Sequence, residues 1–317
     1  MTVNPIDPGP ELPEGHAIDL PGRGTTFVRY ANGPAGAPTL FMLHGWTVSA
    51  DLTFFPVWES LTRHFNVITL DHRGHGRGIR SKTPFKLRDC ADDVAAVCEQ
   101  IGVTSIIALG YSMGGPIAQL LWKRHRRLVS GLVLAATTRN FASSARERRN
   151  FYAMGAMGLG ARALPNSFLH EVGGKILAKR TGRDYEAWML AEINRNDWRM
   201  ILEAGSELGR FDSREWAHEI SVPTSVIVTT QDQLVSPLRQ AKLAADIKDA
   251  KVFEVECAHT GIVVSSDIFV PTLVQACLSV SERINRNHGL QMGAVAHAQA
   301  HSPGKGLGPD FANANVV

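Results

Sequence analysis

One stretch constrains the fold of this chain more than any other: residues 105–128 join an apolar run, a glycine-bounded serine and an amphipathic segment. The apolar run at 105–109 is short and rich in β-branched residues, which predicts a buried strand. It leads into residues 110–114, Gly-Tyr-Ser-Met-Gly, and residues 116–128 then carry apolar side chains at helical spacing. A strand, a Gly-x-Ser-x-Gly motif and a helix in this order predict a sharp turn that raises Ser112 above the end of a sheet.

Two interpretations of this turn stay open on its own residues. In the first, Ser112 is a nucleophile in a strained backbone conformation, beside a helix N-terminus whose dipole favours negative charge. In the second, the motif is a glycine-rich turn that contains a serine by chance. The first interpretation requires the rest of the chain to supply a base, a carboxylate and an oxyanion hole.

Strand and helix patterns alternate along most of the chain. A Pro-Gly turn between two short strands predicts a hairpin at 16–30. The other predicted strands are at 39–43, 66–70, 131–136, 222–230 and 251–255. The other predicted helices are 54–65, 87–101, 236–247 and 266–285. This alternation predicts an α/β fold with a mostly parallel central sheet flanked by helices on both faces.

The alternation stops between residues 138 and 216, where helical patterns occur at 151–164 and 185–208 without a buried strand. Strands then resume, which favours a helical cap at 138–216, inserted after the sixth strand of a core formed by 15–137 and 217–286. The alternative is that these helices are ordinary additional helices of the core. Residues 1–14 are expected to be a flexible N-terminus, and residues 287–317, which lack apolar periodicity, a disordered tail.

An acid and a base follow two of the predicted strands. Asp232 comes directly after the strand at 222–230, and His259 comes directly after the strand at 251–255. The carboxyl ends of parallel strands form the ligand crevice of an open α/β sheet, so both should lie near Ser112. Each alone has a simpler interpretation, since Asp232 could cap the next helix and His259 could be a surface residue. The order Ser112, Asp232, His259 favours a catalytic triad.

An oxyanion hole needs two backbone N–H groups aimed at one point. Met113, directly after the serine, supplies the first, and the loop after the strand at 39–43 supplies the second, for which the Trp46 N–H is the better candidate. The preceding His44 is interpreted as shaping this loop. The side chains expected to line the substrate pocket are Trp46 and Tyr111.

Residues 71–76, Asp-His-Arg-Gly-His-Gly, invite a metal-site interpretation. Asp71, His72 and His75 are suitable ligands, but no further ligands elsewhere in the sequence complete a set. A tight hydrogen-bonded turn after a strand is therefore the favoured interpretation. No metal or cofactor is expected.

Composition restricts the partners. The formal net charge is only +3, so nucleic acid is not expected as a ligand. The four cysteines, at 90, 98, 257 and 277, lack zinc-site spacing and are expected to be reduced core thiols. The sequence shows neither a signal-peptide pattern nor an apolar run long enough to span a membrane, which predicts a cytoplasmic protein and leaves a homodimer open.

These motifs together resemble the α/β-hydrolase fold family, in the branch with a simple His-Gly-x oxyanion loop and a helical cap. The matching residues are His44-Gly45-Trp46, Asp71-His72-Arg73-Gly74-His75-Gly76, Gly110-Tyr111-Ser112-Met113-Gly114-Gly115, Asp232 and Ala258-His259. They span most of residues 16–286. One departure is Tyr111, where many members of this branch carry histidine. The resemblance implies hydrolysis without a cofactor or metal, and a serine at 112 disfavours the epoxide hydrolases and haloalkane dehalogenases, which use aspartate.

The resulting functional prediction is a serine hydrolase that cleaves a carboxylic ester of a small or medium apolar substrate through an acyl-enzyme. Ser112 would attack, His259 would move the proton and Asp232 would orient the imidazole. Two alternatives stay open: hydrolysis of a C–C bond or another acyl group by the same three residues, and a non-catalytic ligand-binding member of the fold.

Overall fold

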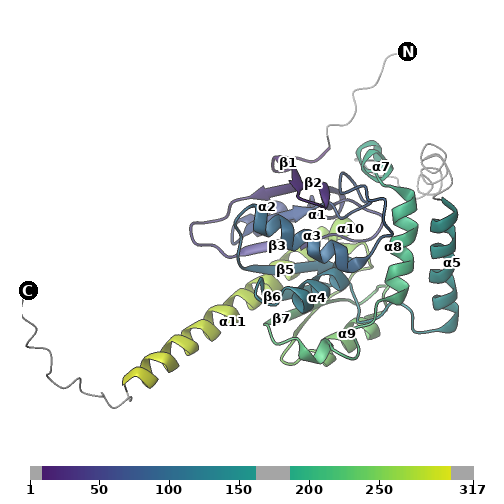
Figure 1. The fold of residues 1–317 in the computed structure, drawn as a ribbon. Coiled ribbons are helices and arrows are strands. Elements are labelled where there is room, and N and C mark those ends of the chain that lie inside the picture. Colours follow the sequence, from purple (N-terminus) through teal and green to yellow (C-terminus); the bar gives the residue numbers. More distant parts are fainter. Residues whose placement is uncertain (1–8, 162–185, 301–317) are drawn as a thin grey trace, which may run out of the picture.

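The computed structural model describes residues 9–161 and 186–300, which fold around one eight-stranded sheet (Figure 1). The strand order is β1-β2-β4-β3-β5-β6-β7-β8. The bounds are β1 Gly15–Leu20, β2 Gly24–Ala31, β3 Thr39–Leu43, β4 Asn66–Leu70, β5 Ile106–Tyr111, β6 Val129–Ala135, β7 Thr224–Thr229 and β8 Lys251–Val255. Only β1 with β2 and β2 with β4 pair antiparallel. The mostly parallel sheet and the N-terminal hairpin are therefore confirmed.

Helices cover both faces of the sheet, as the alternation predicts. On one face lie α3 (Leu87–Gln100), α4 (Gly114–Arg124) and α9 (Pro237–Asp246), and on the other α1 (Ala50–Phe54), α2 (Trp58–Thr62) and α11 (Ser266–Ala300). Short α10 (Gly261–Val264) precedes α11, and the 3₁₀ helix η1 (Ala217–Glu219) precedes β7.

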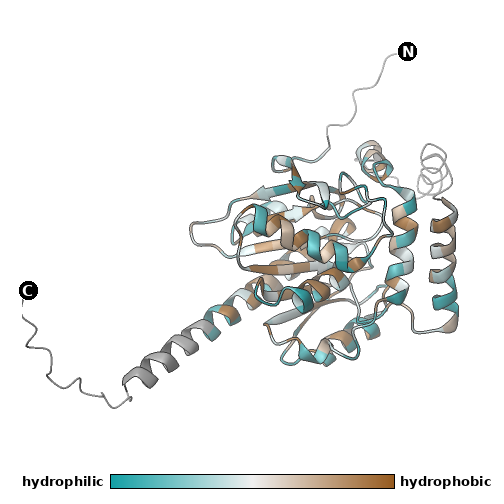
Figure 2. Cartoon of the chain, in the orientation of Figure 1, coloured by the Kyte–Doolittle hydropathy of each residue, from teal (hydrophilic) through white to brown (hydrophobic). Residues whose placement is uncertain are grey.

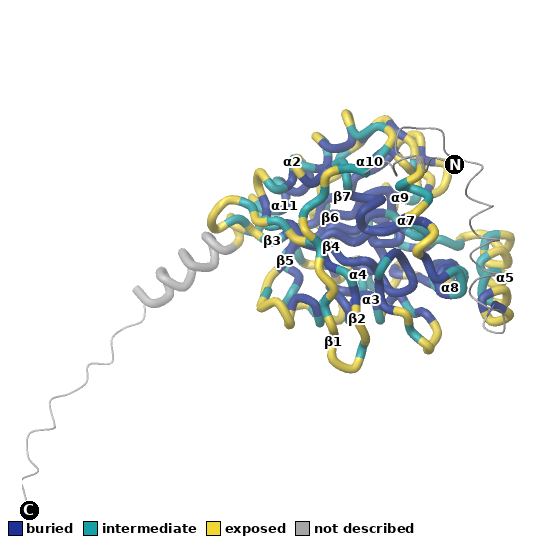
Figure 3. Tube along the Cα trace, turned by 90° about the horizontal axis from the view of Figure 1, so that it is seen from above, coloured by how far each residue is buried: buried dark blue, intermediate teal, exposed yellow. Residues whose placement is uncertain are grey.

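The central strand β5 shows why both layers are needed. Its successive side chains point to opposite faces, so Ile106 and Ala108 join the core under α3 and α4, whereas Ile107 and Leu109 join the core under α11. All six residues of β5 are buried. Apolar residues concentrate in the strands and the helix faces against them (Figure 2), and the central strands are the most buried part of the tube in Figure 3. The strand that leads into Ser112 is therefore buried on both faces.

Two expected helices are interrupted. The helix predicted at 54–65 is wrong as a single element, because α1 ends at Phe54 and α2 begins at Trp58. Pro56 lies between them and has no N–H to continue the helical hydrogen bonds. The pattern at 185–208 likewise forms two helices, α7 (Glu186–Asn194) and α8 (Trp198–Arg210).

Between β6 and β7 the described residues form α5 (Ala145–Ala161), α7 and α8, with no strand beyond an isolated bridge from Asn140 to Asp212. Helices α5 and α8 lie side by side at one end of the sheet (Figure 1), and α8 packs its buried Met200, Ala204 and Leu208 against the core. We use the name cap for the described parts of 138–216, and its identity as an insertion stays a prediction. Residues 162–185 of the predicted cap lie outside the described residues.

The C-terminal boundary differs from expectation. Helix α11 continues to Ala300 rather than ending near residue 285, so the prediction of disorder was wrong for 287–300. Tail residues 301–317 and N-terminal residues 1–8 lie outside the described residues. None of the helices in the described ranges combines the length and apolar character needed to cross a bilayer. The four cysteines are all buried and unpaired.

Candidate active site

Ser112 lies at the turn between β5 and α4, with a backbone φ of 54°. A non-glycine residue rarely adopts this left-handed conformation, so the turn is strained as the motif predicts. Its backbone is held by hydrogen bonds from Ser112 N to Ala135 O (3.0 Å) and from Thr137 Oγ1 to Ser112 O (2.8 Å). The turn is therefore fixed from the neighbouring strand β6.

The two motif glycines are required by close backbone contacts. A Cβ on Gly110 would lie 2.3 Å from the Gly114 carbonyl oxygen, and a Cβ on Gly114 would lie 1.9 Å from the Leu43 carbonyl oxygen. Both distances are far below van der Waals contact, so only glycine allows β5, α4 and the end of β3 to meet here. The motif thereby brings Ser112 next to the loop that follows β3.

The structure brings the three predicted site residues into one hydrogen-bonded chain. His259 Nε2 lies 2.9 Å from Ser112 Oγ, and His259 Nδ1 lies 2.7 Å from Asp232 Oδ2. Asp232 follows β7 and His259 follows β8, so both side chains come from loops at the carboxyl ends of parallel strands. A carboxylate can only accept, so Nδ1 carries the imidazole proton and Nε2 is free to accept the serine proton.

Asp232 has two separate tasks. Its Oδ1 accepts hydrogen bonds from the backbone N–H groups of Leu234 (2.8 Å) and Val235 (2.9 Å), which shape the turn before α9. Its Oδ2 accepts from Thr229 Oγ1 (2.9 Å) as well as facing His259. Burial alone would raise the pKa of this carboxyl, but the hydrogen bond and charge of His259, with the other donors, hold it below its usual value.

The helix-capping alternative for Asp232 does not describe its position, because Ser236 is the N-cap residue of α9. Asp232 instead stabilises the preceding turn and orients the histidine at the same time.

The loop after β3 packs directly against Ser112. A Cβ added to Gly45 would lie 3.5 Å from the Ser112 Cβ, which is ordinary contact distance. Within the described residues, neither the Trp46 nor the Met113 backbone N–H donates to a protein acceptor. Met113 precedes the first turn of α4, where N–H groups have no helical partner. Both predicted oxyanion donors therefore remain available.

His44 fixes the peptide group that carries the Trp46 N–H. Its Nδ1 lies 2.7 Å from the Gly45 carbonyl oxygen, and its Nε2 accepts a hydrogen bond from the backbone N–H of His72 (2.9 Å). Because Nε2 accepts, Nδ1 carries the proton and donates. Burial lowers the pKa of His44 to about 4, so the ring is neutral at physiological pH. A planar peptide couples the orientation of the Gly45 carbonyl to that of the Trp46 N–H.

The two side chains predicted for the substrate pocket have different surroundings. The Trp46 indole Nε1–H donates to the Ile201 carbonyl in α8 (2.8 Å), and its ring faces Gly205 in the same helix. Tyr111 is only 5% exposed, and its hydroxyl donates to the His259 carbonyl. Burial raises the pKa of Tyr111, which keeps this donor protonated. Tyr111 thus supports the loop that carries His259.

Residues 38–265 match the family model described as the alpha/beta hydrolase fold. The chain belongs to this family.

The relatives of this α/β-hydrolase-fold protein carry names that state several different activities. It is 27% identical over 247 residues to the AB hydrolase superfamily protein YisY of Bacillus subtilis, covering 75% of this chain and 89% of that protein. It is 40% identical over 83 residues to the bifunctional esterase/perhydrolase DCH of Acinetobacter calcoaceticus, a match that covers 26% of this chain and only 30% of that protein. The solved esterase EaEST from Exiguobacterium antarcticum has a TM-score of 0.68 at 23% identity, covering 83% of this chain and 98% of that chain, which shows the common fold.

The residues at 71–76 of this hydrolase-fold protein form a hydrogen-bonded turn. Asp71 Oδ1 accepts from the Ala50 N–H and Oδ2 from the Arg77 N–H, both at 2.8 Å. The fully buried rings of His72 and His75 instead pack against His44. Among the residues that the structure describes, no three potential ligands are grouped to hold a metal ion.

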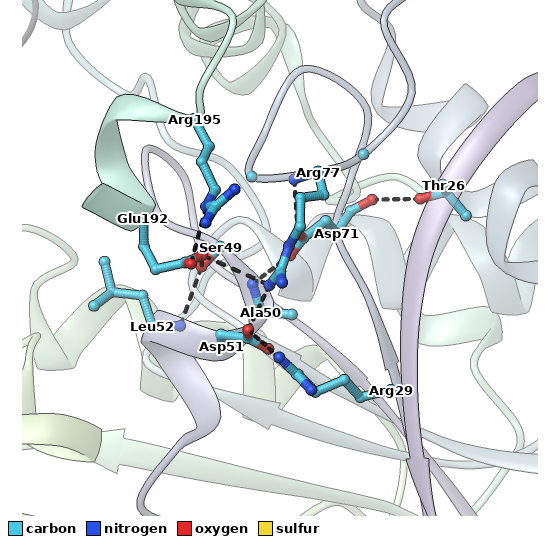
Figure 4. A network of polar contacts seen from close by, with 12 residues as sticks. Thr26, Arg29, Ser49, Ala50, Asp51, Leu52, Asp71, Arg77, Glu192 and Arg195 are labelled. Atoms are coloured by element: carbon cyan, nitrogen blue, oxygen red, sulfur yellow. Dashed lines mark hydrogen bonds and ion pairs between the residues drawn. The ribbon is translucent and has the colours of Figure 1, made fainter. Parts of the chain in front are cut away.

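Behind the loop after β3 lies a polar network that sequence reasoning missed (Figure 4). Arg29 and Arg77 both pair with the buried Asp51 carboxylate, and Glu192 from α7 reaches Ser49. Burial alone would raise the pKa of Asp51, but the two guanidinium groups hold it below its usual value. The available signal was a glutamate within the otherwise apolar α7.

Proposed function

We propose that this protein is a serine hydrolase that cleaves a carboxylic ester of a small or medium apolar substrate through an acyl-enzyme. The observation that carries the proposal is the continuous chain from Ser112 Oγ through His259 to Asp232, with contacts of 2.9 and 2.7 Å. These distances lie within the reach that proton transfer from a nucleophile to its base requires.

The reaction follows from the hydrogen-bond directions. His259 Nε2 takes the Ser112 proton as Oγ attacks the ester carbonyl, and Asp232 stabilises the imidazolium that forms. The Trp46 and Met113 N–H groups bind the developing oxyanion. His259 then gives its proton to the departing alcohol, leaving an acyl group on Ser112. A water molecule, deprotonated by His259, releases the carboxylic acid and restores the serine. No metal or cofactor is required.

An uncharged, apolar substrate is favoured by the side chains beside this site. Gly205 of α8 lies against both the Trp46 ring and the Met154 sulfur of α5. Trp46, at the position of the proposed oxyanion donor, thus joins the site to apolar groups of the cap. Esterases among the relatives and structural neighbours support an ester over the C–C bond alternative.

The test uses p-nitrophenyl esters of increasing acyl length and a fluorophosphonate probe that labels activated serines. We expect ester hydrolysis by the wild-type protein, stoichiometric labelling, and loss of both in Ser112→Ala. Ser130→Ala is the matched control, because Ser130 Oγ only donates to the Ile106 carbonyl (3.0 Å). A folded wild-type protein that is neither labelled nor active would support the non-catalytic alternative. Labelling without ester turnover would point to another acyl substrate.

A further inference from the structure

The segment that carries the proposed oxyanion donor is held largely by the cap. We define residues 44–49 as the oxyanion loop. Three side-chain hydrogen bonds join its second half to α7, α8 and their connection: Trp46 Nε1 to Ile201 O (2.8 Å), Asn196 Nδ2 to Thr47 O (2.8 Å) and Ser49 Oγ to Glu192 Oε2 (3.0 Å). The core holds the first half through His44, whose Nε2 accepts from the His72 backbone N–H (2.9 Å).

Asn196 makes the most demanding of these contacts. It lies between α7 and α8, and it is fully buried. While its Nδ2 donates to Thr47 O, its Oδ1 accepts from the Gly76 N–H at 2.8 Å. One side chain thus bridges the oxyanion loop and the turn after β4. The amide carries its donor and its acceptor on two separate atoms, so one side chain reaches both backbone groups at once.

Thr47 needs such a restraint because its backbone is strained. Its φ is 69°, in the left-handed region that β-branched residues rarely adopt. Strained residues keep their conformation only where neighbouring contacts over-determine it. Thr47 directly follows Trp46, so relaxation at Thr47 would move the Trp46 N–H away from the oxyanion.

Glu192 supplies a second, independent anchor, which Figure 4 shows from close by. The Ser49 hydroxyl donates to Glu192 and accepts from the Leu52 N–H (3.1 Å), which makes Ser49 the N-cap of α1. Glu192 also accepts from Arg195 Nε (3.0 Å), so its charge is compensated although the residue is buried. The end of the oxyanion loop is therefore tied to α7.

We propose that Asn196 is a positioning residue of the oxyanion hole: it locks the strained Thr47 so that the Trp46 N–H points at the substrate oxyanion. This inference rests on the proposed function. It means that the oxyanion hole is complete only when the connection between α7 and α8 is docked on the core. Cap position and transition-state stabilisation are then coupled through one amide.

The test compares Asn196→Asp with Glu207→Gln. The aspartate has the same shape but places an acceptor against the Thr47 carbonyl, whereas Glu207 in α8 pairs with Lys86 on the core (2.8 Å), so its change weakens cap docking without touching the oxyanion loop. Removing one oxyanion donor typically lowers kcat about 10²–10³-fold. We expect Asn196→Asp, which only displaces a donor, to lower kcat about 10–100-fold with KM within about threefold.

A trifluoromethyl ketone tests the oxyanion hole directly, because its adduct with Ser112 places an oxyanion there. A purely structural role of Asn196 would leave the inhibition constant of this ketone unchanged. Its inhibition constant should rise in Asn196→Asp by the same factor as kcat falls, and should stay near the wild-type value in Glu207→Gln. A cooperatively folded Asn196→Asp with wild-type kcat and inhibition constant overturns the inference. An equal effect in Glu207→Gln also overturns it, since the loss would then not depend on the Asn196 amide.

If Asn196→Asp does not fold, Asn196→Ala removes the same hydrogen bond to Thr47 O without adding a charge, and wild-type kcat in that variant overturns the inference. Failure of the proposed function is distinguishable. A wild-type protein that the fluorophosphonate does not label refutes the function and this inference with it. A labelled wild type with a fully active Asn196→Asp refutes only the role of Asn196.

Discussion

His259 Nδ1 lies 2.7 Å from Asp232 Oδ2, while the other oxygen of this carboxylate is held by two backbone N–H groups. The carboxylate cannot rotate without breaking the bonds to Leu234 and Val235. The orientation of the His259 ring is therefore set by the backbone of the turn after β7. This relationship makes the tautomer of His259 a property of the fold, because a fixed acceptor keeps the proton on Nδ1.

Replacing Asp232 by asparagine should abolish this control. An amide in place of Oδ2 can donate to Nδ1, which favours the tautomer with the proton on Nε2 and removes the base facing Ser112. We expect kcat for an ester to fall about 10³–10⁴-fold, with KM little changed. Asp212→Asn is the control, because Asp212 pairs with the exposed Arg214. Activity within tenfold of wild type in Asp232→Asn would contradict the proposed role.

Three buried histidines should make the fold sensitive to acid. Burial, the largest cause, lowers the pKa of His44 to about 4 and those of His72 and His75 well below 6.5. In the unfolded chain each histidine takes up a proton near pH 6.5, whereas in the folded protein it stays neutral. The unfolded state therefore binds more protons below pH 6.5, and stability is lost as the pH falls from 6.5 towards 4.

The expected slope is up to about 1.4 kcal/mol per pH unit for each histidine, measured by urea unfolding between pH 7.5 and 4.5. His72→Leu should reduce the slope by about one histidine. It should cost little at pH 7.5 beyond repacking, because neither ring nitrogen of His72 has a hydrogen-bond partner among the described residues. Equal slopes for His72→Leu and wild type would refute this explanation of acid sensitivity.

The core sheet and the three hydrogen-bonded site residues could be predicted because their signals are local. Buried parallel strands are continuous apolar runs, and Ser112 and Asp232 follow such strands, β5 and β7, whereas His259 follows the more exposed edge strand β8. The carboxyl edge of the sheet then brings them together whatever the intervening chain does.

The polar contacts around the oxyanion loop could not be predicted in this way. Asn196 and Thr47 are 149 residues apart, and neither belongs to a motif. Whether a polar side chain is buried, and which backbone group it meets, depends on packing between the cap and the core. The single helix predicted at 185–208 also overlooked a local signal. Residues 194–197, Asn-Arg-Asn-Asp, interrupt the apolar pattern, and Asp197 caps α8 by accepting from the Met200 N–H (3.2 Å).

A buried ion pair on the α3 side should contribute strongly to stability when one partner is removed. Arg73 Nε and Nη2 donate to the two oxygens of Asp93, both at 2.7 Å, and the side chains are 6% and 2% exposed. Asp93 also pairs with Arg23 (2.6 Å), so Asp93→Asn removes the carboxylate that both guanidinium groups share and leaves the buried Arg73 with the longer contact to Asp89 (3.6 Å). This should cost about 3–5 kcal/mol in the free energy of unfolding. The exposed pair of Arg126 and Glu219 gives the control. Glu219→Gln should cost about 0–1 kcal/mol, and a similar cost for both would contradict the prediction.

The last prediction concerns Gly114 in the turn. It tests whether an added Cβ is harmful because of the close backbone contact at this position or because any glycine-to-alanine change is harmful. Gly114→Ala places a Cβ where the Leu43 carbonyl oxygen is only 1.9 Å away, so β3 and α4 must separate. That shift would move both the oxyanion loop and Met113. We therefore expect either an unfolded protein or one with ester kcat lowered about 10²-fold or more.

Gly160→Ala in α5 is the matched substitution, since among the described residues no atom beyond the chain neighbours and the helix's own backbone lies within 4 Å of the added Cβ. Alanine is the better helix former, so Gly160→Ala should keep full activity and gain about 0.5–1 kcal/mol in the free energy of unfolding at most. Thermal unfolding and ester kcat are measured on Gly114→Ala and Gly160→Ala and compared with the wild type. A Gly114→Ala protein as stable and active as Gly160→Ala would mean that the end of β3 can yield, and that Ser112 does not depend on the contact that glycine allows.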